Sequence, residues 1–298
     1  MADLNFAAID IGTNAVRLII KGVEEGSKPD GKLNKKLLLR IPLRLGNDVF
    51  SSGKISEKKE EQLLHSITAF KEIMLAYQVS HYRACATSAM RDASNGPSVV
   101  RKINSACGIN IEIISGHEEA SLLYSSHAGN LFDTDNHYIC VDVGGGSTEI
   151  SRIENGKLIS TESYNIGTLR LLHEKTDKNE IVRLHFDLET IRSQYTNIRI
   201  IGSGGNINKL FRLSLSNAEE PFKIASLEKI YSKLKNMSVT ERIEKLQLKP
   251  DRADVIVPAA SLFLDIARCV GVTEIIVPTL GLGDGIVYDL YKKYLIER

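Results

Sequence analysis

The sequence has 298 residues, which corresponds to about two domains of ordinary size. Hydrophobic residues make up 43% of it and charged residues 25%, so the chain is expected to bury a sizeable core and is not a disordered protein. The formal net charge of +1 argues against a protein that coats DNA. The sequence shows neither a signal peptide nor an apolar segment long enough to span a membrane, and we expect a cytoplasmic α/β protein.

The N-terminal segment predicts a β-hairpin. An apolar strand begins at Phe6 and enters a polar turn at residues 12–14, and a second strand follows over residues 15–22. After a polar segment, residues 37–45 predict a third strand, in which Pro42 favours a position at the sheet edge because proline cannot donate a hydrogen bond.

Helices and strands then alternate. Residues 56–77 predict a helix capped by Ser56, because apolar side chains recur there at helical spacing. The next predicted elements, in order, are a strand at 82–87, a helix at 97–107, a strand at 110–115 and a helix at 117–129. This alternation indicates parallel strands joined by crossover helices.

The pattern of the first hairpin returns at Tyr138. Residues 138–153 repeat the order of residues 6–20: an apolar strand with an aspartate, a glycine turn, and a second apolar strand. Asn155-Gly156 then predicts a hairpin turn. The duplication predicts two domains of similar topology, residues 1–126 and 127–298, which could clamp a ligand between them.

The remaining sequence predicts mainly helices. Expected elements are a helix near 172–195, a strand at 198–201, a strand at 274–277, a turn at 281–285 and a helix at 286–295. A basic, mostly helical stretch, residues 209–249, carries nine Lys/Arg against five Glu. It is interpreted as a solvated helical surface, with binding of a polyanion as the alternative.

Two acidic residues flank the glycine turn of the second hairpin. If Gly145 and Gly146 occupy the centre of the turn, Asp142 and Glu149 lie directly opposite each other on adjacent strands. Like charges in that arrangement repel, and a divalent cation between them would remove the repulsion. The alternative is that one carboxylate caps the turn while the other faces solvent.

Glycine-rich turns follow three predicted strands, at residues 12–14, 144–147 and 202–205. A turn without Cβ atoms lets successive backbone N–H groups approach phosphate oxygens. Neither a Walker A motif nor a complete dinucleotide-binding glycine motif is present. The three turns together therefore favour a phosphate chain as ligand.

Two predicted strand-to-helix junctions carry charged residues that are candidates for a functional site. Residues 86–93 form a natural anion site, to which Arg91 adds guanidinium donors. Glu118 and Glu119 begin the helix after the other junction and point about 100° apart, so only one can face a ligand. Both could instead simply complement the helix dipole.

Cysteine and histidine patterns give no site. The four cysteines lack a C-x-x-C spacing, and Cys85 and Cys140 lie in apolar strand-like runs that predict buried, inert thiols. The histidines form neither an H-E-x-x-H motif nor a close pair on one helical face, so a histidine metal site is not expected.

Several long motifs in chain order resemble the exopolyphosphatase and guanosine pentaphosphate phosphatase family. They lie at residues 9–14, 86–95, 114–120, 142–149, 167–170 and 252–258. The resemblance implies the fold of the actin, hexokinase and Hsp70 superfamily, with two ribonuclease H-like domains flanking a cleft. It also implies removal of terminal phosphate from inorganic polyphosphate or the guanosine pentaphosphate alarmone, and a dimer by family habit.

The resemblance assigns roles to individual residues. It makes Glu119 the base that activates water, with Arg91 beside it, and it makes Asp142 and Glu149 ligands of Mg²⁺ or Mn²⁺. Phosphate would be held by Thr13, Asn14, Arg91, Gly144, Gly145, Gly146, Ser147 and Gly204. Such an arrangement suits phosphoryl transfer, which depends on positioning and charge neutralisation.

Three positions depart from the family pattern. An arginine of the late Gly-Leu-Arg-Glu-Gly motif is replaced by Gly283, a threonine after two glycines is replaced by Asn206, and a glycine is replaced by Ala259. These differences bear on substrate contacts and leave the expected catalytic residues in place. The chain also stops where long members continue into a further helical domain.

Two alternatives stay open. One is an ATP-dependent small-molecule kinase of the same superfamily, which would transfer phosphate to an acceptor other than water. The other is a protein that binds guanosine polyphosphates without hydrolysing them, which the loss of the arginine at position 283 makes conceivable.

Overall fold

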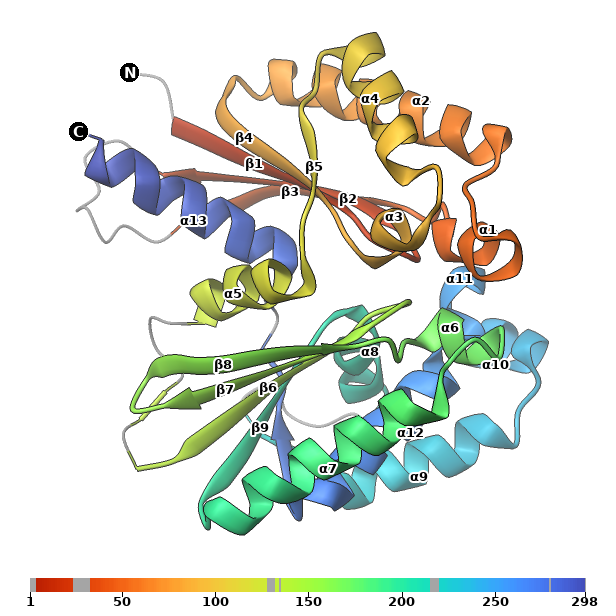
Figure 1. Cartoon of the computed structure of the whole chain (residues 1–298), viewed down its shortest axis with the longest axis vertical. Coiled ribbons are helices and arrows are strands. Elements are labelled where there is room, and N and C mark those ends of the chain that lie inside the picture. The colour runs from red at the N-terminus through yellow and green to blue at the C-terminus, as the bar shows by residue number, and fades with distance from the viewer. Residues whose placement is uncertain are drawn as a thin grey trace. The chain divides into compact units, whose positions relative to one another are not determined.

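The computed structural model describes residues 4–23, 33–127, 132–133, 135–214, 220–278 and 280–297. The chain divides into two compact units, residues 1–126 with 282–298, and residues 127–281. Each unit is built on one β-sheet with helices packed against it (Figure 1).

Unit 1 holds a five-stranded sheet in the order β3-β2-β1-β4-β5. Its strands are β1 (Leu4–Ile11), β2 (Val16–Val23), β3 (Asn34–Ile41), β4 (Val79–Ala86) and β5 (Ile111–Ile113). Its helices are α1 (Leu45–Ser52), α2 (Glu57–Ala76), α3 (Ser88–Asp92), α4 (Gly96–Cys107), α5 (Gly116–His127) and α13 (Leu282–Ile296). α2 and α4 cover one face of the sheet, and α5 and α13 cover the other (Figure 1).

Unit 2 holds a six-stranded sheet in the order β10-β11-β9-β6-β7-β8. Its strands are β6 (His137–Val143), β7 (Thr148–Glu154), β8 (Lys157–Tyr164), β9 (Ile198–Ser203), β10 (Phe222–Lys223) and β11 (Glu274–Ile276). Its helices are α6 (Thr168–Leu172), α7 (Lys178–Gln194), α8 (Gly205–Leu213), α9 (Ile224–Lys235), α10 (Val239–Leu246), α11 (Pro250–Ala253) and α12 (Ile256–Val270).

The predicted duplication is visible in the strand order. β8-β7-β6-β9-β11 repeats the order of β3-β2-β1-β4-β5, and β10 is an addition at the edge. In both sheets an antiparallel hairpin supplies the first two strands, and parallel strands extend the sheet on the other side. The expected α/β fold class with two related halves is therefore confirmed.

Local sequence signals account for several element ends. The Ser56 hydroxyl accepts a hydrogen bond from Lys59 N and caps α2, as predicted. Asn155 and Gly156 adopt φ of +50° and +70°, which is the hairpin turn that the dipeptide predicts. β3 lies at the sheet edge as expected, but it covers Asn34–Ile41 and stops before Pro42. The segment beyond Pro42 forms α1, which the sequence pattern did not predict.

The C-terminal segment corrects two expectations. Residues 281–285 were predicted to form a turn, but α13 already begins at Leu282. A Cβ at Gly285 would lie 1.9 Å from the Leu122 carbonyl oxygen, so this glycine allows α13 to pack closely on α5. α13 also belongs to unit 1 and not to the domain 127–298 that the sequence suggested, because Ile286 and Tyr291 are buried in the same core as Phe6.

Candidate active site

In unit 1, the polar residues of interest lie at the carboxyl ends of the parallel strands β1, β4 and β5. The hairpin turn after β1 is closed by Gly12 N, which donates to Ala15 O at 3.1 Å. Thr13 is 4% exposed, and its hydroxyl accepts from Ala89 N at 3.2 Å. Asn14 lies beside it in the same turn, and its carbonyl accepts from Arg44 N at 3.0 Å. The turn is thereby fixed to the start of α3.

The hairpin of unit 1 carries an ion pair across its strands. Asp10 pairs in register with Arg17, and the two side chains form a salt bridge of 2.5 Å between Oδ2 and Nη1. Asp10 is 4% exposed. A buried carboxylate with a guanidinium partner has its charge compensated within the protein.

α3 and α5 bring Arg91 and Glu119 together. Arg91 Nη1 donates to Glu119 Oε2 at 3.1 Å and to the Ile114 carbonyl at 2.8 Å. Among the described residues, no acceptor is found for Arg91 Nε or Nη2. The guanidinium therefore orients the Glu119 carboxylate and keeps donors for an anion.

The neighbouring Glu118 points to a different partner. Its Oε1 accepts from Arg83 Nη2 at 2.5 Å, and Arg83 also binds Glu112. The structure thus separates the two adjacent glutamates, as helical geometry requires. Glu118 belongs to an ion-pair network on β4 and β5, and Glu119 to the strand-end cluster with Arg91.

In unit 2, the two predicted carboxylates lie opposite each other. Asp142 on β6 is in register with Glu149 on β7, as the spacing predicts. The register continues to Ser203 on β9 and Ser163 on β8. Side chains at directly paired positions share one face of a sheet, so these four form a polar row across the end of the sheet.

Glu149 is buried within this row. It is 2% exposed, and its Oε1 accepts hydroxyl hydrogen bonds from Ser147 at 2.6 Å and Ser163 at 3.0 Å. The interpretation in which one of the two carboxylates faces solvent does not hold for Glu149. Charge-assisted bonds from two hydroxyls hold the carboxylate in one orientation.

In the turn Gly144–Ser147 every carbonyl accepts a hydrogen bond, and Gly144 N closes the turn by donating to Ser147 O at 2.9 Å. The start of α6 donates to the other carbonyls: Thr168 N to Gly144 O at 3.0 Å, and Leu169 N to Gly145 O at 2.8 Å. Arg170 Nε binds Gly146 O at 2.8 Å. Within the described residues, no acceptor takes the N–H groups of Gly145 and Gly146. With every carbonyl engaged, the turn is polarised as a cradle for an anion.

Gly204 completes the strand-end cluster of unit 2. Its φ of +98° lies in the region that glycine favours, and it caps α8 after β9. A Cβ at this position would lie 2.6 Å from Asp142 Oδ1. Gly204 therefore allows the Asp142 carboxylate to lie against the backbone at the start of α8.

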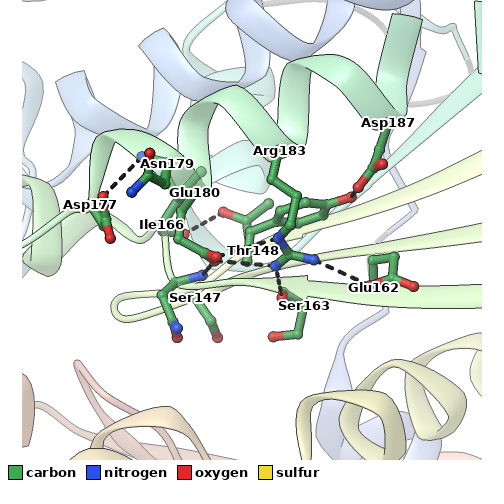
Figure 2. Close-up of polar contacts among 12 residues, drawn as sticks. Ser147, Thr148, Glu162, Ser163, Ile166, Asp177, Asn179, Glu180, Arg183 and Asp187 are labelled. Atoms are coloured by element: carbon green, nitrogen blue, oxygen red, sulfur yellow. Dashed lines mark hydrogen bonds and ion pairs between the residues drawn. The ribbon is translucent and has the colours of Figure 1, made fainter. Parts of the chain in front are cut away.

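A second polar network fixes the strand that carries Ser163 (Figure 2). Arg183 on α7 donates from Nη2 to the Ser163 carbonyl at 2.6 Å and pairs with Glu180. Its guanidinium lies 4.2 Å from the ring centroid of Tyr164, whose hydroxyl donates to Asp187 at 2.7 Å. Burial and the nearby Asp187 raise the pKa of Tyr164, so its hydroxyl remains a donor. The end of β8 is therefore anchored to α7.

The sequence did not identify Arg17, Ser163 or Arg183 as parts of these clusters, and it placed Arg170 only within the motif 167–170, without a role. Ser163 and Arg17 could have been found by extending the strand register outward from the aspartates. Arg183 acts through a backbone carbonyl, which carries no sequence signal.

The structure also bears on the expected buried cysteines and on membrane-spanning helices. Cys85 and Cys140 are buried as predicted, and burial raises the pKa of Cys85 to about 12, which makes it a poor nucleophile. Within the described residues, no helix combines the length and the apolar character needed to cross a membrane.

Comparison with known proteins identifies relatives over most of the chain. The profile of the Ppx/GppA phosphatase family matches residues 32–294. Exopolyphosphatase 2 of Mycobacterium tuberculosis is 28% identical, with 97% of this chain and 99% of that protein covered. The guanosine-5'-triphosphate,3'-diphosphate pyrophosphatase of Photobacterium profundum is 24% identical, but the alignment covers 97% of this chain and only 59% of that protein.

Solved structures agree in fold. The Aquifex aeolicus member of the Ppx/GppA family superposes with a TM-score of 0.77 at 26% identity, and 99% of each chain is covered. An exopolyphosphatase from Cytophaga hutchinsonii superposes with a TM-score of 0.85 at 23% identity, covering 97% of this chain and 98% of that one. The chain therefore has the actin-like fold of these proteins.

Proposed function

Because the chain belongs to the Ppx/GppA phosphatase family, we propose that it is a phosphohydrolase that releases the terminal phosphate of inorganic polyphosphate or of guanosine pentaphosphate. The single observation that carries this proposal is the turn Gly144–Ser147. α6 binds the carbonyls of residues 144–146, and among the described residues no acceptor takes the N–H groups of Gly145 and Gly146, which lie next to the paired carboxylates Asp142 and Glu149. A cradle of this kind suits a chain of phosphates better than a neutral substrate.

In this proposal, Glu119 is the general base. Its carboxylate takes a proton from the water that attacks the terminal phosphorus, while the bond to the leaving phosphate oxygen breaks and that oxygen keeps the electron pair. Arg91 orients the carboxylate and donates its remaining N–H groups to phosphate oxygens. Base catalysis of this type contributes about 10²–10⁴-fold.

The amide groups of Gly145, Gly146 and Gly204 and the hydroxyl of Ser147 are assigned to phosphate binding in unit 2. Gly144 belongs to the same phosphate-binding turn and closes it, because its own N–H donates to Ser147 O at 2.9 Å. Thr13 and Asn14 are assigned to phosphate binding in the turn of unit 1. The donors are fixed before substrate arrives, because hydrogen bonds to α3 and α6 hold both turns. Preorganised donors stabilise the charge that develops on the transferring phosphoryl group.

Ppx/GppA enzymes generally depend on a divalent metal. Asp142 and Glu149 fit Mg²⁺ or Mn²⁺ chemically, because they are hard oxygen donors opposed on one face of the sheet. A cation held there would neutralise phosphate charge. Ser147 and Ser163 serve this arrangement by fixing the orientation of the Glu149 carboxylate.

The test is phosphate release by Glu119→Gln, with Glu118→Gln as a matched control. Both substitutions remove one charge from the first turn of α5, but Glu118 is bound to Arg83 and lies outside the proposed machinery. We expect Glu119→Gln to lower kcat by about 10²–10⁴-fold and Glu118→Gln to change it less than about threefold. Equal activity of Glu119→Gln and wild type would overturn the assignment of the base.

The same assay separates the alternatives. Inorganic phosphate released from polyphosphates of graded length and from guanosine pentaphosphate supports hydrolysis and ranks the substrates. Transfer from ATP to a small acceptor would indicate a kinase. Binding of guanosine polyphosphates with no turnover of any phosphate donor would indicate a binding protein.

A further inference from the structure

A His–Asp–Cys cluster lies in unit 2, on α7 and α12. His185, Asp265 and Cys269 each offer one potential metal ligand, and these three atoms lie within 4.8 Å of one another. His185 Nε2 is 2.7 Å from Asp265 Oδ2. All three side chains are partly exposed, so an ion in solution can reach them.

We propose that His185, Asp265 and Cys269 form a binding site for a borderline-soft divalent cation, with Zn²⁺ as its natural occupant. Imidazole, thiolate and carboxylate together are a zinc donor set, whereas Mg²⁺ prefers oxygen alone. The cluster uses none of the residues assigned to phosphate hydrolysis, so this inference does not depend on the proposed function.

Helix geometry brings the ligands together. Asp265 and Cys269 are four residues apart on α12 and therefore project from the same face. α7 packs against α12 and supplies His185 from the neighbouring helix. Since helical spacing and helix packing both fix the donors, the cluster is prearranged and its ordering costs little on binding.

The distances are compatible with tetrahedral coordination. With zinc bonds of about 2.0–2.3 Å, ligand atoms lie about 3.3–3.6 Å apart. His185 Nε2 and Asp265 Oδ2 would separate by about 0.6 Å from their present 2.7 Å. The Cys269 Sγ, which lies within 4.8 Å of both atoms, would take a distance of about 3.3–3.6 Å from each.

The surrounding charges also favour a cation. Cys269 lies in the last turn of α12, at the negative end of the helix dipole. Burial first, and then the charges of Asp265 and Glu189, raise the pKa of the Cys269 thiol, while Arg192 opposes them. Cation binding would displace the thiol proton to solvent and leave a thiolate ligand. Glu189, one turn beyond His185, or a water molecule would take the fourth position.

A simple ion pair explains the cluster less completely. His185 and Asp265 have side-chain exposures of 37% and 43%, and an exposed pair of this kind contributes little to stability. It also gives no role to the adjacent thiol. A bound cation, by contrast, uses all three donors and fastens α7, which carries Arg183, to α12.

The experiment uses the full chain, stripped of metal with a chelator and returned to buffer with Mg²⁺ in excess. Added Zn²⁺ is measured by equilibrium dialysis and metal analysis, and Co²⁺ is used as a spectroscopic probe. We expect one Zn²⁺ per chain, a thiolate-to-cobalt charge-transfer band, and a Tm rise of about 5–10 °C when zinc exceeds its Kd by about 100-fold.

The variants are His185→Ala, Asp265→Asn and Cys269→Ser, with Cys107→Ser and Glu149→Gln as controls. We expect the first three to weaken zinc binding by about 100-fold or more and Cys269→Ser to abolish the cobalt band. Cys107→Ser and Glu149→Gln keep both signals, which distinguishes this site from another thiol and from the carboxylate pair. Absence of the cobalt band in wild type, or zinc binding that Cys269→Ser and His185→Ala leave unchanged, would overturn the proposal.

Discussion

The hairpins that open the two units have the same strand pairing, but the residue opposite the aspartate is basic in one and acidic in the other. In each, an aspartate lies two residues before a four-residue turn, and the residue two positions after the turn pairs with it across the strands. In unit 1 this partner is Arg17, which neutralises Asp10 in a salt bridge. In unit 2 it is Glu149, which adds a second negative charge beside Asp142.

The two copies of one motif therefore differ in whether the aspartate has a partner of opposite or of like charge. The hairpin of unit 1 compensates its buried carboxylate internally, as a protein core requires. The hairpin of unit 2 places like charges at directly opposed positions, which is unfavourable in the absence of a cation. Since the backbone is the same, the cross-strand partner decides which copy is suited to hold a metal.

Among changes that bear on the two hairpins, the largest effect is expected from Glu149→Gln. Removal of this charge leaves the fold of the hairpin and its hydroxyl contacts largely intact but weakens the proposed cation site, so we expect phosphate release to fall by about 10³-fold. The measurement is kcat as a function of Mg²⁺ concentration. A variant with unchanged kcat and Mg²⁺ response would show that the carboxylate pair is not the metal site.

The next effect is expected from Arg17→Glu, which gives unit 1 the carboxylate pair of unit 2. Asp10 loses its partner and faces a like charge, so we expect the free energy of unfolding to fall by about 1–3 kcal/mol. Arg17→Lys, which keeps the charge, is the control and should cost less than about 1 kcal/mol. Urea unfolding with and without Mg²⁺ measures both.

Recovery of stability by Mg²⁺ in Arg17→Glu alone would mean that the opposed carboxylates suffice to bind a cation. If Mg²⁺ has no effect there, the serines and glycine turn of unit 2 are needed as well.

An effect on stability of similar size is expected from Gly204→Ala. A positive φ strains any side chain, and the new Cβ would contact Asp142, so we expect a loss of about 1–3 kcal/mol in stability together with reduced kcat. Gly53→Ala is a matched control, because Gly53 has φ +76° with no atom within 4 Å of the new Cβ. It should lose about 1 kcal/mol and keep kcat. Equal kcat values for the two variants would contradict the proposed role of Gly204 in phosphate binding.

The smallest effect is expected from Arg183→Gln, and it depends on pH. Burial alone would raise the pKa of Glu180, but Arg183 and the Asn165 amide outweigh burial and lower it. A lowered carboxyl pKa contributes stability that is present above about pH 4.3 and lost as pH falls through the folded-state value. The variant should therefore be less stable than wild type by about 1 kcal/mol near neutral pH, with the difference shrinking in acid.

Chemical denaturation between pH 3 and 7 tests this, with Lys178→Gln on the same helix as control. A difference that stays constant over that range would mean that Arg183 stabilises β8 through packing and not through Glu180.

Much of the fold could be predicted, because local signals governed it. Alternating strands and helices, the Ser56 cap and the Asn155-Gly156 turn all fixed elements where the pattern placed them. The opposition of Asp142 and Glu149 followed from counting residues around one turn. Such inferences succeed when the interacting residues are near each other in sequence.

Features that depend on packing between residues far apart in sequence could not be predicted. The glycines of residues 281–285 resembled a turn, but two of them lie in α13, where Gly283 packs close to Ile19 of β2 and Gly285 close to Leu122 of α5. His185 and the pair Asp265 and Cys269 are far apart in sequence and meet only because α7 packs on α12. The local sequence around each residue does not indicate this contact.

The membership of α13 in unit 1 has a consequence for synthesis on the ribosome. Unit 2 is a continuous segment and can complete its sheet and core as soon as residue 281 has emerged. Unit 1 begins first but finishes last, since Phe6 and Cys85 are enclosed only when Ile286 and Tyr291 arrive. The apolar face of the first sheet therefore stays exposed while unit 2 folds. A truncated chain that lacks α13 would keep that face exposed.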